Sequence, residues 1–159
     1  SFGQTAYSAA KAAIVGMART WAVECAKANV TVNAIIPTAL TRMVATIPGL
    51  GSLVEEVEKG APVPRDVRLR GLGKPEDAAG LVVYLASDAA AHVTGQAIGI
   101  GGDRIALWSH PAEVVTAVRE GGWSAEAIAE IFPSVFAPRL QEFRPEPLEA
   151  PKKDSGAGK

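Results

Sequence analysis

The chain has 159 residues, 48% of them hydrophobic and 21% charged, a composition typical of one globular domain with a core of its own. A formal net charge of −1, without a basic block or an apolar run of membrane-spanning length, argues against nucleic acid or a membrane as a partner. A single cysteine excludes an internal disulfide framework and indicates a reducing, cytoplasmic location, and two distant histidines without ligand spacing predict no metal site.

The first predicted element is a helix over residues 5–28, because this stretch is rich in alanine, the best helix former. Tyr7 and Lys11 are four residues apart, which places their side chains one above the other on one helix face. A cation close to a phenol favours the phenolate, and such a tyrosine can exchange a proton with an alcohol or a carbonyl near neutral pH. Pairs with this spacing also occur as solvated surface neighbours, so the spacing alone leaves both interpretations open.

The interior of this helix, residues 12–18, is apolar or small on nearly every side. Such a helix is expected to be buried on more than one face. One face can pack on a sheet, and for the other we expect the same helix of a second subunit. Cys25, which we place in the same helix, is expected to be a small buried side chain.

Residues 30–36 are rich in β-branched side chains and end at Pro37, which predicts a buried strand of a parallel sheet. Residues 44–73 carry several prolines and glycines between short apolar clusters. We expect one or two short helices in a mobile segment there, with one near residues 52–59. Long connections of this kind are often lids or binding loops, and the apolar residues at 44–54 suit either a substrate pocket or an ordinary core.

A proline followed by two acids predicts that a helix begins at residues 74–75 and runs to about residue 86. A turn over residues 89–94 and a short strand over residues 96–100 follow. Because the two predicted strands are joined by a crossover that contains a helix, we expect them to be parallel with a right-handed connection.

Beyond the second strand we expect a short helix over residues 111–119, which two glycines end. Ser124 can cap a further helix over residues 125–131. From residue 138 onward the chain is rich in proline and charge and lacks a core pattern, which predicts a disordered tail. We therefore assign residues 1–137 to one domain with a helical extension, and residues 138–159 to the tail.

The run from Gly3 to Lys11 resembles the active-site helix of the short-chain dehydrogenase/reductase family, in which a Tyr-x-x-x-Lys pair is catalytic. The resemblance covers residues 1–103. It implies an α/β fold in which this chain forms the C-terminal half of a Rossmann-type, doubly wound parallel sheet. It also implies that Tyr7 is the catalytic acid/base and that Lys11 assists it, both residues contacting the nicotinamide end of NAD or NADP.

Three further residues match cofactor-binding positions of that family. Pro37 matches the proline that ends the sixth strand beside the nicotinamide, and Thr38 stands where many members have glycine. Thr41 resembles a threonine that reaches the cofactor phosphates, although a simple helix N-cap is the open alternative.

Residues 33–43 are most similar to a branch that includes (3R)-hydroxyacyl-CoA dehydrogenase modules of multifunctional enzymes and related bacterial proteins. The resemblance implies an apolar alcohol or ketone substrate, such as a 3-hydroxyacyl thioester or a hydroxysteroid, and a homodimer or homotetramer. The complete protein is thus expected to be an NAD(P)-dependent oxidoreductase that interconverts a secondary alcohol and a ketone. The alternative is a truncated or degenerate, non-catalytic member that acts only in assembly.

Two parts of the family's site are missing from these residues. The catalytic serine would precede Ser1, and no glycine cluster has the G-x-G-x-x-G spacing of a phosphate-binding loop. The chain also begins with serine and enters its first predicted helix almost at once. We therefore expect it to be the C-terminal part of a longer protein, and we expect the fragment alone to be inactive.

Overall fold

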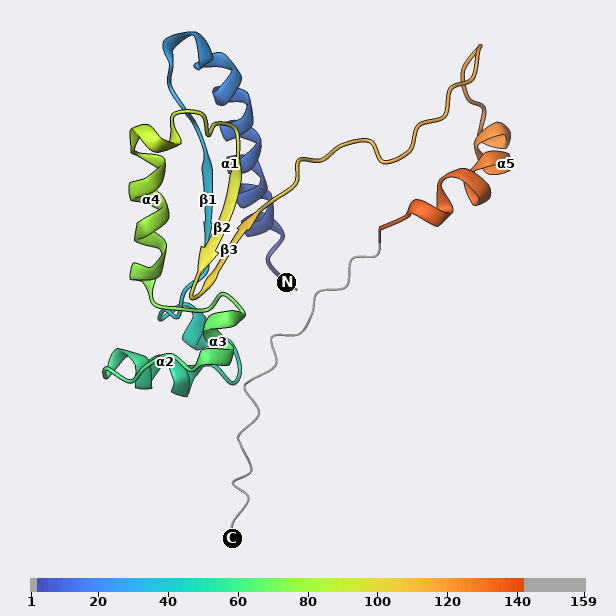
Figure 1. Ribbon diagram of the computed structural model, residues 1–159. Coiled ribbons are helices and arrows are strands. Elements are labelled where there is room, and N and C mark those ends of the chain that lie inside the picture. The colour runs from blue at the N-terminus through green and yellow to red at the C-terminus, as the bar shows by residue number, and fades with distance from the viewer. Residues whose placement is uncertain (1–2, 142–159) are drawn as a thin grey trace. The chain divides into compact units, whose positions relative to one another are not determined.

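The computed structural model describes residues 3–141, which fall into two units, residues 3–109 and residues 110–141. The first unit contains a three-stranded sheet of order β1 (Ala34–Pro37), β2 (Ala97–Gly101) and β3 (Arg104–Leu107). Helices α1 (Thr5–Glu24) and α4 (Ala79–Leu85) lie on either side of this sheet (Figure 1). Two shorter helices, α2 (Gly51–Glu58) and α3 (Arg65–Leu69), lie beyond the carboxyl end of β1. The assignment of residues 1–137 to a single domain remains a prediction.

Helix α1 spans Thr5–Glu24 and is followed by a 3-10 turn at Ala26–Ala28. The helical segment ends at Asn29, whose φ of 55° is left-handed, a conformation that asparagine tolerates better than most residues. The predicted helix is therefore confirmed, with an earlier end. Cys25 lies just after the α-helix and is only half-buried, so the expectation of a buried cysteine within the helix was wrong.

Burial of α1 is restricted to one narrow stripe. Ala18 and Ala22 are buried, and Ala18 packs against the two parallel strands. Ile14, Met17 and Trp21 keep between 42% and 49% of their surface exposed. The sheet thus covers one face of the helix, as expected, and leaves large apolar side chains on the rest of it.

Strand β1 spans Ala34–Pro37, so it begins four residues later than predicted. In the residues just before β1, hydrogen bonds to side chains take the place of the backbone bonds of regular strand pairing. The backbone N–H of Val32 donates to the Thr94 hydroxyl at 3.0 Å, and the side-chain oxygen of Asn33 accepts from the backbone N–H of Gln96 at 3.0 Å. These bonds satisfy backbone donors that regular pairing would otherwise use.

Strand β2 spans Ala97–Gly101 and pairs in parallel with β1, with Ala34 opposite Ala97. The chain reaches it through a 3-10 turn at Asp88–Ala90, at the edge of the predicted turn region. The predicted parallel pair is therefore confirmed, with β2 shifted by one residue.

Strand β3, Arg104–Leu107, was missed from the sequence, and it pairs antiparallel with β2. Gly102 and Asp103 form the two-residue connection, with Gly102 at a φ of 51°. Glycine at the first central position suits a tight hairpin turn, so this Gly-Asp dipeptide between two isoleucine-containing runs was the available signal.

Residues 44–73 form two helices around a core of their own. Helix α2 spans Gly51–Glu58, as predicted near residues 52–59, and α3 spans Arg65–Leu69. Val54 is among the most deeply buried side chains of the first unit. The buried side chains of this segment pack with Leu40 into one cluster, which supports the interpretation as ordinary core; within the segment they are Leu50, Leu53, Val54, Val57, Val63, Val67 and Leu72.

The predicted helix that begins with Pro75 is confirmed, but its first turn is 3-10. The 3-10 turn spans Pro75–Ala78, and α4 follows at Ala79–Leu85. The Asp77 carboxylate accepts a hydrogen bond of 2.8 Å from the backbone N–H of Lys74, which caps the start of this element.

The second unit holds helix α5, Ala125–Val135, and a 3-10 turn at Ala137–Arg139. Ser124 caps α5 as predicted, with its hydroxyl accepting from the backbone N–H of Ala127 at 3.2 Å. The helix predicted over residues 111–119 is absent from the structure, so that prediction was wrong.

The predicted tail is structured at its first residues, and residues 142–159 lie outside the described part of the chain. No helix among residues 3–141 is long and apolar enough to cross a membrane.

Candidate active site

Tyr7 and Lys11 lie on the N-terminal half of α1, on the same helix face. The Lys11 ammonium is 5.3 Å from the centroid of the Tyr7 ring, within the range of a cation–π contact. Tyr7 keeps 53% of its surface exposed, and Lys11 is exposed as well. The predicted spatial pairing of the two side chains is therefore present.

Two of the predicted cofactor contacts lie at the carboxyl end of β1. Pro37 is opposite Ile100 in the sheet, and the backbone N–H of Thr38 donates to the Ile100 carbonyl at 2.9 Å. The Pro37 ring and the Thr38 side chain are both exposed. Ligands of open α/β sheets bind at this end of the parallel strands, so the position suits the predicted role.

Thr41 lies further along, between β1 and a 3-10 turn at Val44–Thr46. That turn begins after Met43, so Thr41 is not its N-cap. The Thr41 carbonyl accepts from the backbone N–H of Ala45 at 3.0 Å, and the residue is half-buried. The sequence left a helix N-cap open as the alternative role of Thr41, and the structure excludes that role for this turn.

Gly101 allows the end of the sheet to approach the segment that follows α3 closely. A Cβ atom at this position would overlap the carbonyl oxygens of Thr38 and Gly71. An isolated parallel bridge between Ala39 and Gly73 continues the same contact. The position of Thr38 therefore depends on the absence of a side chain at Gly101. The sequence pattern indicated only that a strand ends near Gly101.

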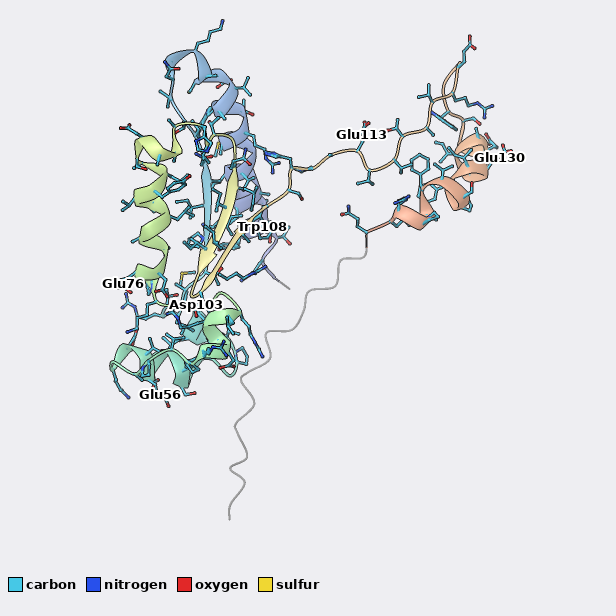
Figure 2. All side chains as sticks on the ribbon, viewed as in Figure 1. Glu56, Glu76, Asp103, Trp108, Glu113 and Glu130 are labelled. Carbon is cyan, nitrogen blue, oxygen red and sulfur yellow. The ribbon has the colours of Figure 1, made fainter. Side chains whose placement is uncertain are left out.

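An ion-pair cluster joins α3 to the two elements beside it. The Arg68 guanidinium lies 3.1 Å from the Asp77 carboxylate and 2.7 Å from that of Asp103, which Figure 2 shows at the β2–β3 turn. The hydrogen bond to Asp103 is the main reason that the pKa of Arg68 is raised above its ordinary value. These residues are far apart in sequence, so spacing could not reveal the cluster.

Within residues 3–141, no group of three or more histidine, cysteine, aspartate or glutamate side chains could hold a metal ion.

The comparisons with known proteins agree on one family. The family profile described as "Enoyl-(Acyl carrier protein) reductase" matches residues 2–102. The 3-oxoacyl-[acyl-carrier-protein] reductase FabG of Thermotoga maritima is 42% identical over 101 residues, which are 63% of this chain and 38% of that protein. Human dehydrogenase/reductase SDR family member 4 is 35% identical over 104 residues, 63% of this chain and 34% of that protein.

Among solved structures, a short-chain dehydrogenase from Mycobacterium avium aligns with a TM-score of 0.56 and 26% identity. The alignment covers 81% of this chain and 36% of that one. The chain therefore belongs to the short-chain dehydrogenase/reductase family, and the predicted Rossmann-type α/β fold is confirmed. It spans little more than a third of the length of these relatives.

Proposed function

We propose that the complete protein is an NAD(P)-dependent oxidoreductase that interconverts a secondary alcohol and a ketone. The observation that carries this proposal is the Tyr7–Lys11 pair, which lies inside the stretch matched by the family profile. Relatives named 3-oxoacyl-[acyl-carrier-protein] reductase support the same reaction type.

Tyr7 is proposed to move the proton. Its phenol donates to the carbonyl oxygen when a ketone is reduced and accepts from the hydroxyl when an alcohol is oxidised. The Lys11 ammonium, 5.3 Å from the centroid of the Tyr7 ring, places a positive charge beside the group that is proposed to move the proton. When bound, the nicotinamide supplies or accepts the hydride.

The residues present suit the nicotinamide end of the cofactor. Lys11 offers three N–H donors and Thr38 a hydroxyl, both exposed, and these groups can bind ribose hydroxyls and a carboxamide. Tyr7, Pro37 and Thr41 complete the proposed contact set. Because the 159 residues contain no G-x-G-x-x-G run, the phosphates would need residues beyond these.

For the substrate we propose an apolar ketone or alcohol, either a 3-oxoacyl or 3-hydroxyacyl thioester or a hydroxysteroid. The finer assignment to the hydroxyacyl-CoA dehydrogenase branch rests on residues 33–43. We also propose a cytoplasmic homodimer or homotetramer. The exposed apolar side chains of Ile14, Met17 and Trp21 support an interface on α1, since a two-fold partner would bury them symmetrically.

The test is a hydride-transfer assay on the complete protein with acetoacetyl thioester and steroid ketones, using NADH and NADPH in turn. Lys11→Ala should lower kcat/KM by about tenfold or more, because a charge-assisted contact is lost. Lys27→Ala, an exposed lysine in the 3-10 turn after α1, is the matched control and should be unchanged. If the parent protein reduces none of these ketones, the result would favour the non-catalytic alternative.

A further inference from the structure

An arginine on α3 joins two separate elements of the first unit. The Arg68 Nε donates to the Asp103 carboxylate at 2.8 Å, and its Nη1 donates to the Asp77 carboxylate at 3.1 Å. Asp103 belongs to the β2–β3 turn, as Figure 2 shows, and Asp77 belongs to the 3-10 turn before α4. The single guanidinium of Arg68 therefore ties α3 to both of these turns.

The backbone of Arg68 lies against the same β2–β3 turn. Its carbonyl oxygen accepts from the backbone N–H of Asp103 at 3.0 Å and from that of Gly71 at 2.9 Å. A Cβ atom on Gly102 would lie 2.6 Å from this oxygen, closer than real Cβ contacts. The turn is thus packed on the end of α3 with no side chain of Gly102 between them.

A series of backbone contacts continues from this turn to Thr38. A Cβ atom on Gly73 would lie 2.5 Å from the Cα of Gly102, so these two backbones are also in close contact. The Gly73 carbonyl accepts from the backbone N–H of Leu40 at 2.7 Å, and Gly73 forms the parallel bridge with Ala39. A shift of the β2–β3 turn would therefore be transmitted to the residues that immediately follow Thr38.

The ion pairs of Arg68 act on a junction that is rich in glycine. Gly71, Gly73 and Gly102 all take part in these contacts, and glycine has more conformational freedom to lose than any other residue. The Arg68 side chain is 30% exposed, and partly exposed ion pairs add little to overall stability. Loss of these pairs is therefore expected to shift the junction rather than to unfold the protein.

We propose that Arg68 is a positioning residue for the nicotinamide end of the site and that it acts through Thr38. By binding Asp103 and Asp77, its guanidinium holds the β2–β3 turn against the segment that contains Gly73. The two together set where the exposed Thr38 hydroxyl lies. The inference rests on the proposed oxidoreductase function, in which Thr38 contacts the cofactor, and it assigns Arg68 no contact of its own with cofactor or substrate.

The test combines steady-state ketone reduction with NADH titration of the complete protein. Arg68→Gln should raise the KM and the Kd for NADH by about threefold or more, because a displaced Thr38 loses its hydrogen bond, while kcat at saturating NADH stays within about twofold of the parent. Arg68→Lys keeps the charge and should recover part of the lost affinity. Arg65→Gln changes an exposed arginine of α3 that is in neither ion pair, and it should match the parent.

A purely structural role of Arg68 has a different signature. It would lower Tm and the folded fraction, which circular dichroism measures, and would thus reduce the apparent kcat while leaving the KM for NADH unchanged. That result in Arg68→Gln would overturn the proposal.

A double-mutant cycle with Thr38→Val tests whether Arg68 acts through Thr38. Thr38→Val alone should weaken NADH binding, and Arg68→Gln should then raise the Kd by much less than it does in the parent. Additive effects, or a Thr38→Val protein with the parent affinity, would overturn the proposal. A parent protein that binds NADH but reduces no ketone would contradict the oxidoreductase function alone, because the Kd values still decide the role of Arg68. A parent that binds neither NADH nor NADPH would overturn both.

Discussion

Replacing Gly101 with alanine perturbs a close backbone contact at the carboxyl end of the sheet. The added Cβ would overlap two backbone carbonyl oxygens, those of Thr38 and Gly71. Overpacking typically destabilises a protein by about 1–3 kcal/mol, and backbone atoms cannot rotate away as side chains can, so we expect about 3 kcal/mol. For a domain of ordinary size this lowers Tm by about 6–12 °C.

Thermal unfolding of the complete protein, followed by circular dichroism, measures this effect, and titration with NADH measures the displacement of Thr38. Gly80→Ala is the matched control, because Gly80 lies in α4 and a Cβ added there would meet no atom within 4 Å. That variant should be neutral or more stable by up to about 1 kcal/mol. A Gly101→Ala protein with the parent Tm and NADH affinity would refute the close approach at this end of the sheet.

Other elements allow three further predictions. Ser124→Ala should destabilise α5 by about 1 kcal/mol, seen as reduced helicity or a lower midpoint of urea unfolding. The pKa of Glu126 is lowered, first by a hydrogen bond from its own backbone N–H and then by the Ser124 hydroxyl. Its stabilising effect is therefore present above the unfolded pKa and should be lost as the pH falls through the lowered folded pKa. Helicity that is unchanged in acid would contradict that assignment. Met17→Glu should dissociate or misfold the oligomer, and sedimentation showing the parent to be a stable monomer would refute the α1 interface.

Much of the framework could be predicted because it is local. The alanine-rich run of α1, the proline that begins the helical segment before α4 and the serine that caps α5 each act within a few residues. The parallel pairing of β1 and β2 could be predicted because a crossover that contains a helix joins the two strands. The same local reasoning placed Tyr7 beside Lys11, since four residues make one helical turn.

Apart from β3, whose Gly-Asp turn was a local signal, the parts that were missed depend on contacts between distant residues. The cluster around Arg68 joins residues 9 and 35 positions away, and the close approach at Gly101 brings together three separate segments. The predicted helix over residues 111–119 failed for a related reason. Val114 and Val118 are exposed, so nothing packs against a helix there, and short isolated helices are marginal in water.

The proposed role of Tyr7 in moving the proton is tested most directly by the turnover of Tyr7→Phe in the complete protein. We predict that kcat for ketone reduction falls by about a hundredfold or more, because general acid catalysis typically contributes that much, while NADH affinity stays close to that of the parent. Tyr84→Phe removes the only other tyrosine hydroxyl of the chain and should keep full turnover. Equal turnover in Tyr7→Phe and the parent would contradict the assignment of Tyr7 as the catalytic acid/base.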